Sequence, residues 1–194
     1  MRKGKIKRKT RETNISVEME LDGVGRGEID TKIPFMDHML NLLARHGLFD
    51  LKISGQGDRE VDDHHLVEDL GICLGNAVKK ALGDKEGIAR YGAALAPMDE
   101  SLASVALDIS GRPCLVYHAE LGEARIGAFD PSLLREFFKA FSDHGGITLH
   151  INVLYGKNNH HMAEAAFKAF ALALRSAVQL DERIQGVMST KGLL

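Results

Sequence analysis

The chain has 194 residues, a formal net charge of −2 and 27% charged residues, values typical of one globular domain or two small ones. They argue against a disordered, collagen-like or coiled-coil protein. No apolar run reaches the roughly 18 residues of a membrane helix, and no apolar segment follows the basic N-terminus as in a secretory signal. Two cysteines form no disulfide framework and fit a reducing compartment, so we expect a cytoplasmic protein with no membrane partner.

The first half of the chain predicts strands, a helix, a strand and a second helix. Residues 14–21 alternate apolar and polar with a period of two, and the glycine-rich DGVGRG follows as a turn. A helix is predicted from Pro34 to Gly47, then a strand over 49–54, then a helix over 62–82 that Gly83 would end.

Seven of the first eleven residues are Lys or Arg. A basic run of this kind can bind nucleic acid, but the net charge is slightly negative and no aromatic residues are interleaved. The run is better interpreted as the solvated face of a strand, and no nucleic-acid partner is expected.

The rest of the chain repeats this order. Strands are predicted over 93–99, 101–110 and 113–121, a helix over 131–144, a strand over 145–156 and a helix over 159–179. The histidine pair at 160–161 matches the pair at 64–65 with an offset of 96 residues. The sequence thus predicts an α+β fold made by tandem duplication, with halves 1–86 and 87–180 and an irregular tail 181–194 at the substrate site. Each half should be a sheet with helices on one face, and a second sheet or another subunit must then cover any remaining apolar surface.

Both predicted helices open with the motif HHxxE, as His64-His65-Glu68 and His160-His161-Glu164. Fewer than one such motif is expected by chance at this composition. The first histidine and the glutamate of each motif share a helix face, while the second histidine points about 100° away. Each histidine pair should therefore serve two different ions. Imidazole and carboxylate ligands without thiolate suit Mn²⁺, Fe²⁺ or Zn²⁺.

Two further residues are candidate ligands. His38 lies near the start of the first helix, and the repeat places Glu136 at the corresponding position of the second half. Glu136 could be a ligand in which a carboxylate replaces an imidazole, or an ordinary solvated helix charge.

Basic residues could bind an anion. Arg90, Arg112 and the segment STKG offer cations, a hydroxyl and backbone amides suited to a phosphate. Lys168 lies one helical turn beyond Glu164, where it could hold a phosphate near the metal or merely form an ion pair.

Eight motifs, in order from residue 11 to the tail, together resemble the imidazoleglycerol-phosphate dehydratase family: RETNISVE, PFMDHML, DDHHLVEDLGICLG, PMDESL, DISGRP, TLHI, NNHHMAEAAFKAFALALR and STKG. The resemblance implies a lyase of histidine biosynthesis that removes water from imidazoleglycerol phosphate to give imidazole-acetol phosphate. It further implies duplicated halves with four-stranded sheets, a ribosomal protein S5 domain 2-like fold, and a cytoplasmic homo-oligomer of 24 subunits built from trimers. Active sites would lie between subunits and hold two Mn²⁺ ions each.

The resemblance also assigns residues. The metal ligands would be His38, His64, His65, Glu68, His160, His161 and Glu164, with Glu136 standing where the family often has histidine. The phosphate-binding residues would be Arg90, Arg112, Lys168, Ser189 and Lys191. Glu12 matches a glutamate implicated in proton transfer, and Glu68 and Glu164 are the other candidate catalytic carboxylates.

The elimination removes a proton from a carbon that no carbonyl acidifies. If both nitrogens of the substrate imidazole were bound to metal, the ring would become an imidazolate that could expel the neighbouring hydroxyl, through a diazafulvene-like intermediate. Glu164 or Glu12 would act as general base, and the phosphate contacts would orient the ring. Two alternatives remain: a di-metal hydrolase of phosphate esters, and a metal-storage or scaffold protein whose HHxxE helices join subunits.

Overall fold

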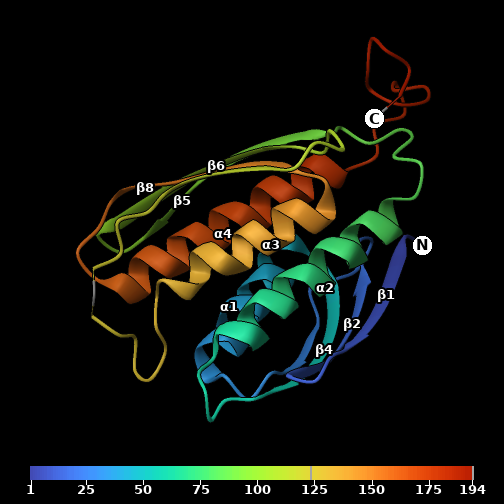
Figure 1. Cartoon of the computed structure of the whole chain (residues 1–194). Coiled ribbons are helices and arrows are strands. Elements are labelled where there is room, and N and C mark those ends of the chain that lie inside the picture. The colour runs from blue at the N-terminus through green and yellow to red at the C-terminus, as the bar shows by residue number, and fades with distance from the viewer. Residues whose placement is uncertain (123, 194) are drawn as a thin grey trace.

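The computed structural model describes residues 1–122 and 124–193 and contains two four-stranded mixed sheets of the same topology (Figure 1). The first has the strand order β1-β2-β4-β3 and the second β5-β6-β8-β7. In each sheet three strands pair antiparallel and the last edge strand pairs parallel. The strands are β1 (Lys3–Lys9), β2 (Thr13–Glu20), β3 (Gly27–Asp30), β4 (Asp50–Gly57), β5 (Tyr91–Met98), β6 (Ser101–Asp108), β7 (Cys114–His118) and β8 (Thr148–Tyr155).

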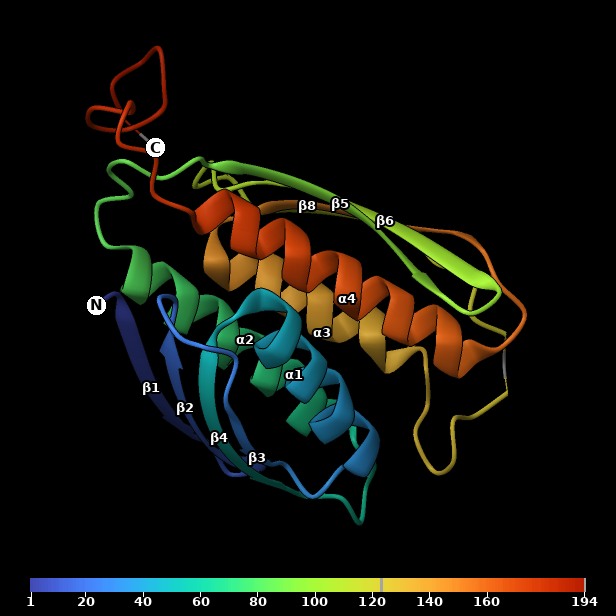
Figure 2. The ribbon, with the colours of Figure 1, turned by 180° about the vertical axis from the view of Figure 1, so that it is seen from behind.

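Four helices lie between the two sheets (Figure 2). They are α1 (Pro34–Gly47), α2 (His64–Leu82), α3 (Leu133–Gly145) and α4 (Asn159–Val178). Helices α1 and α2 cover the first sheet, and α3 and α4 cover the second. Across the middle, α2 packs against α3 and α1 against α4. The duplicated α+β fold is confirmed, but helices of the opposite half, rather than a second sheet, cover each helical layer.

Local sequence signals explain most of the helix boundaries. Helix α1 has its predicted bounds, with Pro34 in its first turn and a left-handed Leu48 as its C-terminal cap. Helix α2 begins two residues later than predicted, because the Asp62 carboxylate accepts a hydrogen bond from the His64 amide at 2.8 Å. Helix α4 begins at Asn159, where the Asn158 side chain accepts from the His160 amide.

The core is continuous through the helical layers. Inward residues of the strands alternate with exposed ones, as in β2, where Ile15, Val17 and Met19 are buried. Between α3 and α4 the fully buried aromatic rings pack at centroid distances of 4.9–5.6 Å; they belong to Phe137, Phe138, Phe141, Phe167 and Phe170. These contacts join α3 to α4, and the packing of α2 on α3 and of α1 on α4 connects the other two helices to them.

Each sheet approaches its long helix through one glycine. A Cβ atom on Gly4 of β1 would collide with the backbone oxygen of Ala77 in α2, and a Cβ on Gly92 of β5 with that of Ala173 in α4. The repeat therefore preserves a close backbone contact in both halves.

Replacing Gly92 with Ala should destabilise the fold by about 1–3 kcal/mol or more, because backbone atoms must move to admit the methyl group. Thermal unfolding of Gly92→Ala and of Gly122→Ala provides the test, since a Cβ on Gly122 would lie no nearer than 3.8 Å to its neighbours. Equal melting temperatures for the two variants would contradict the close contact.

The C-terminal residues 179–193 contain no helix or extended strand. Within the described part of the chain, none of the helices combines the length and apolar character needed to cross a membrane.

Candidate functional site

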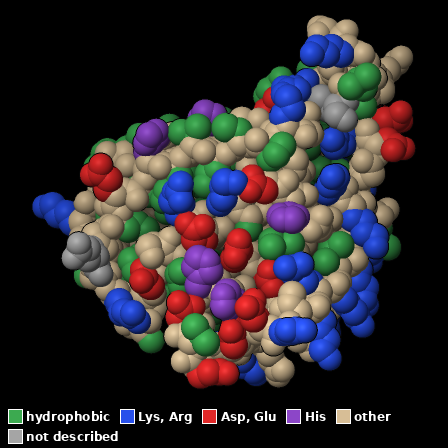
Figure 3. Space-filling model, viewed as in Figure 1, with side chains coloured by type: hydrophobic (Ala, Val, Ile, Leu, Met, Phe, Trp, Pro, Cys, Tyr) green, Lys and Arg blue, Asp and Glu red, His purple; other side chains and the backbone are tan. Residues whose placement is uncertain are grey.

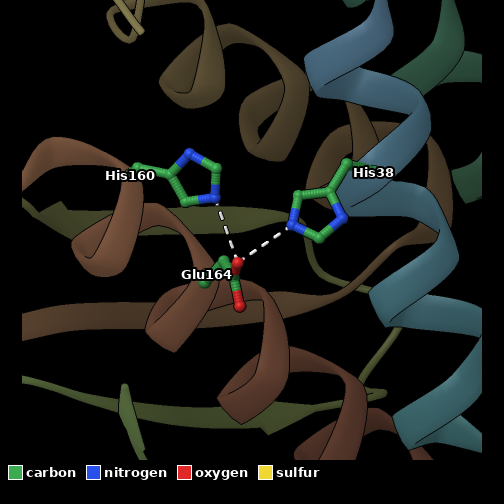
Figure 4. Close-up of side chains that lie close together, drawn as sticks. All are labelled: His38, His160 and Glu164. Carbon is green, nitrogen blue, oxygen red and sulfur yellow. Dashed lines mark hydrogen bonds and ion pairs between the residues drawn. The ribbon is translucent and has the colours of Figure 1, made fainter. Parts of the chain in front are cut away.

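The N-terminal turns of α4 and the second turn of α1 bring three predicted ligands together (Figure 4). Glu164 Oε1 lies 2.9 Å from His38 Nε2 and 3.0 Å from His160 Nε2. Its other oxygen, Oε2, lies 2.8 Å from the Lys168 ammonium. The pairing of α1 with α4 thus places His38 opposite an HHxxE motif that lies more than 120 residues away in the sequence.

Glu164 is held as a carboxylate. Burial raises the pKa of Glu164, but hydrogen bonds from Lys168 and His38, the Lys168 charge and the His160 contact outweigh it and set the pKa at about 2. Glu164 is therefore ionised at neutral pH and available as a metal ligand.

A second group forms where the β1–β2 turn, the end of β4 and the start of α2 meet. His65 Nδ1 lies 3.1 Å from Asp58 Oδ2 and 4.0 Å from Glu12 Oε2, and the three residues could share an ion. His64, on the neighbouring helix face, lies 3.8 Å from Glu68. The two histidines of this motif thus face different carboxylates, as their helical spacing predicts.

His161 occupies the corresponding place in the second half. Its Nδ1 lies 2.7 Å from Glu100 Oε2, and its Nε2 lies 3.7 Å from Asp99. Glu100 Oε1 accepts hydrogen bonds from the amides of Lys157 and Asn158, at 3.1 and 3.0 Å. The contact with His161 and these amides set the pKa of Glu100 at about 2. Because Glu100 contacts Nδ1 of His161, the Nε2 atom of this imidazole is the nitrogen left to bind a metal.

Sequence reasoning missed Asp58 and Glu100. The repeat contained a signal for Glu100: β1 pairs with β2 through Ile6 and Val17, and β5 pairs with β6 through Ala94 and Val105, so Glu12 and Glu100 occupy equivalent turns. Asp58 had no such signal, because the corresponding residue of the second half is Gly156.

The donor chemistry of both groups fits a divalent metal. Imidazole nitrogens and carboxylate oxygens converge, with ligand atoms of each group within 4.8 Å of one another. Histidine and acidic side chains also gather on the molecular face that presents α2 and α3 (Figure 3). Among the described residues, neither group combines ligands of both HHxxE motifs. Glu136 belongs to neither group and lies 3.2 Å from the Arg135 guanidinium.

Four of the five predicted phosphate-binding residues line one basic cavity of about 970 Å³. It lies between the start of β5, the β6–β7 loop and the C-terminal tail, and those four residues are Arg90, Arg112, Ser189 and Lys191. Arg90 is 8% exposed; its guanidinium binds both oxygens of Asp108, at 2.6 and 3.0 Å, and donates to the Met188 carbonyl at 2.6 Å. The fifth residue, Lys168, lies beside Glu164 instead.

Helix α4 separates this cavity from the Glu164 group. The Arg90 amide donates to the Ala177 carbonyl near the end of α4, whereas Glu164 lies in its second turn. Thirteen residues at about 1.5 Å each place the two sites roughly 20 Å apart along one chain. A small substrate cannot span that distance within a single chain.

Metal affinity should fall as the pH decreases toward 5, because an imidazole must be neutral to bind a metal. A hydrogen bond with Asp58 raises the pKa of His65, and one with Glu100 raises the pKa of His161. A raised pKa keeps the charged form present at higher pH, so protons should compete with the metal already above the ordinary histidine value of about 6.5. Mn²⁺ titrations from pH 8 to pH 5 measure this, and a constant affinity would contradict imidazole ligation.

Comparison with known proteins gives one consistent result. The family model described as imidazoleglycerol-phosphate dehydratase matches residues 31–174. Proteins of that name are similar over the whole chain: the one from Syntrophus aciditrophicus is 64% identical over 100% of this chain and 99% of the relative, and the one from Geobacter metallireducens is 59% identical with the same coverage.

Solved structures of such dehydratases are also similar. The one from Staphylococcus aureus is 38% identical with a TM-score of 0.84, covering 92% of this chain and 99% of its own. The one from Pyrococcus furiosus, in complex with (S)-C348, is 40% identical with a TM-score of 0.85, covering 97% and 100%.

Proposed function

The chain belongs to the imidazoleglycerol-phosphate dehydratase family of histidine biosynthesis, and from this premise we propose how it performs the reaction. It eliminates water from imidazoleglycerol phosphate to give imidazole-acetol phosphate at a site that takes two Mn²⁺ ions. The observation that supports this most directly is the convergence of His38, His160 and Glu164 from two helices of different halves. When bound, the two ions supply Lewis acidity toward the imidazole ring of the substrate.

The carboxylates have different environments, which suggests different roles. Glu164 is buried, and two imidazole nitrogens converge on its Oε1 while Lys168 holds Oε2 in place, so this residue is suited to hold a metal together with the two histidines. The Glu12 side chain is more than half exposed, and its described contact is the 4.0 Å approach to His65. Glu12 is therefore free to take or give a proton at the substrate carbon or oxygen, while Glu68, His64 and His65 form the ligand set of α2.

The phosphate group of the substrate would lie in the basic cavity. Lys191 and Arg112 reach it with exposed cations, and Asp108 and the Met188 carbonyl fix Arg90 at its wall. Contacts at the phosphate would hold the distant imidazole ring in one orientation and so supply part of the rate enhancement.

Because the cavity and the Glu164 group lie roughly 20 Å apart on one chain, the complete site requires two subunits. The two sheets differ in a way that supports assembly. On its outer face the first sheet has ion pairs such as Lys5–Glu18, whereas the second exposes Tyr91, Leu95 and Leu154, with Leu95 62% exposed. An apolar outer face of this kind is typical of a subunit contact. A homo-oligomer of 24 subunits built from trimers, with cytoplasmic location, is the proposed form.

The experiment is a turnover assay on protein stripped with chelator and then supplied with Mn²⁺. Imidazole-acetol phosphate formation should disappear on stripping and return with the metal. Release of inorganic phosphate instead would favour a di-metal hydrolase. A scaffold would form neither product. Its assembly would depend on metal and would not change when Arg112 and Lys191 are substituted.

A further inference from the structure

A buried carboxylate that the proposed chemistry does not use lies directly beside the metal-ligand motif of α2. Asp69 follows Glu68, is 7% exposed and points to the sheet instead of the site. Its Oδ1 accepts a hydrogen bond from Arg8 Nε of β1 at 2.9 Å, and its Oδ2 accepts one from the Thr13 hydroxyl of β2. Asp69 thus ties the ends of two strands to the helix that carries His64, His65 and Glu68.

Those two strand residues bracket the turn that carries Glu12. Within the turn, Thr10 Oγ1 accepts hydrogen bonds from the amides of Glu12 and Thr13, at 3.0 and 2.9 Å. The Glu12 carbonyl accepts one from the Asp58 amide at 3.0 Å. A continuous set of contacts therefore runs from Asp69 through the turn to Asp58, which contacts His65.

The duplicated half provides an internal control, because the same packing occurs there without any charge. The strand register and the repeat of the HHxxE motifs place Ala96, Ser101 and Ala165 at the positions of Arg8, Thr13 and Asp69. Ala96 is 4% exposed and Ala165 is fully buried. The strand pair can thus pack on its helix with alanines. Burying the Asp69 carboxylate there carries a desolvation cost that a purely structural contact does not require, and the half-exposed Arg8 offsets only part of it.

The two halves also hold their turn glutamates differently. In the second half the Glu100 side chain itself is fixed, by the amides of Lys157 and Asn158 and by His161. In the first half the Glu12 backbone is fixed, and its side chain extends freely toward His65. Anchoring the backbone alone lets a carboxylate keep its place while remaining available for proton transfer.

We propose that Asp69, through Arg8 and Thr13, is a positioning residue that sets the Glu12 turn against α2 for the reaction. The inference rests on the proposed role of Glu12 in proton transfer. It assigns the Arg8–Asp69 ion pair a part in turnover and none in metal binding or in the stability of the half-domain.

The test is a variant that copies the second half, Arg8→Ala/Thr13→Ser/Asp69→Ala, measured as the full-length, Mn²⁺-loaded enzyme. Its kcat should fall by about 10- to 100-fold, with KM and metal content within about twofold of the parent. Amide hydrogen exchange of residues 10–13 should accelerate while exchange in α2 and α4 stays slow. Asp22→Ala, which removes an exposed partner of Arg2 near the same strand, is the matched control and should keep parental kcat.

A double-mutant comparison separates positioning from a merely structural effect. In a Glu12→Gln background, the triple substitution should lower kcat by less than about twofold, because the residue it positions is already disabled.

An equal fall in both backgrounds, a loss of bound metal, or unchanged kcat in the triple variant would overturn the inference. If Glu12→Gln itself keeps parental activity while the triple variant loses it, the inference fails as well. A parent enzyme without dehydratase activity would refute the proposed function alone, and unchanged exchange of residues 10–13 would separately refute the anchoring.

Discussion

Replacing Glu164 with Gln should lower kcat by about 10²- to 10⁴-fold while the protein still folds and assembles. The amide keeps the size of the side chain but removes the charge that His38, His160 and Lys168 share. Because the carboxylate has a pKa of about 2, the substitution changes a group that is fully ionised at the pH of the assay. Steady-state rates, bound Mn²⁺ per chain and thermal unfolding should be measured together.

Asp143→Asn is the matched control for this substitution. It removes a carboxylate of α3 that pairs with Lys139 at the surface, away from both ligand groups, and it should leave the rate unchanged. A Glu164→Gln variant with bound metal and near-parental kcat would show that this carboxylate serves neither as ligand nor as base.

Co-assembly of two inactive variants should restore about one quarter of the parental activity. One variant is Glu164→Gln, and the other is Arg112→Ala/Lys191→Ala, in the basic cavity. If each site takes its metal group from one chain and its phosphate cavity from another, random mixing of equal amounts leaves about a quarter of the sites with both parts intact. The variants should be co-expressed and their ratio in the purified assembly measured by mass spectrometry.

The matched control mixes Glu164→Gln with His160→Ala. Every chain in this mixture carries one substitution or the other, and both substitutions damage the same ligand group. No site in the mixed assembly then has an intact ligand group, and the assembly should stay inactive. Absence of recovery in the first mixture as well would mean that a single chain supplies both parts, and the roughly 20 Å separation along α4 would then have to close by a conformational change.

The repeated motifs made much of the fold predictable. Apolar periodicity and Pro34 placed α1 at its observed bounds, and the two HHxxE motifs located the starts of α2 and α4. The packing of α1 on α4 could not be read in the same way, since a periodic apolar face specifies burial and does not specify its partner.

Only those site residues that belong to a recognisable sequence motif could be predicted. The fixed helical spacing of HHxxE identified His160 and Glu164, and the family resemblance added His38; the structure brings the three together. Asp58 belongs to a group assembled from a turn, a strand end and a helix start, and no local pattern marks an acidic residue at such a junction. The separation of Lys168 from the basic cavity likewise depends on the direction in which α4 runs.

The interleaving of helices from both halves has a consequence during protein synthesis. The apolar faces of α1 and α2 are covered by α3 and α4, and the end of α4 is made roughly 100 residues after that of α2. At ribosomal speeds of about 5–20 residues per second, the nascent first half waits roughly 5–20 s with one helical layer uncovered. During that interval its exposed apolar surface makes the nascent first half prone to aggregation until the second half has been synthesised.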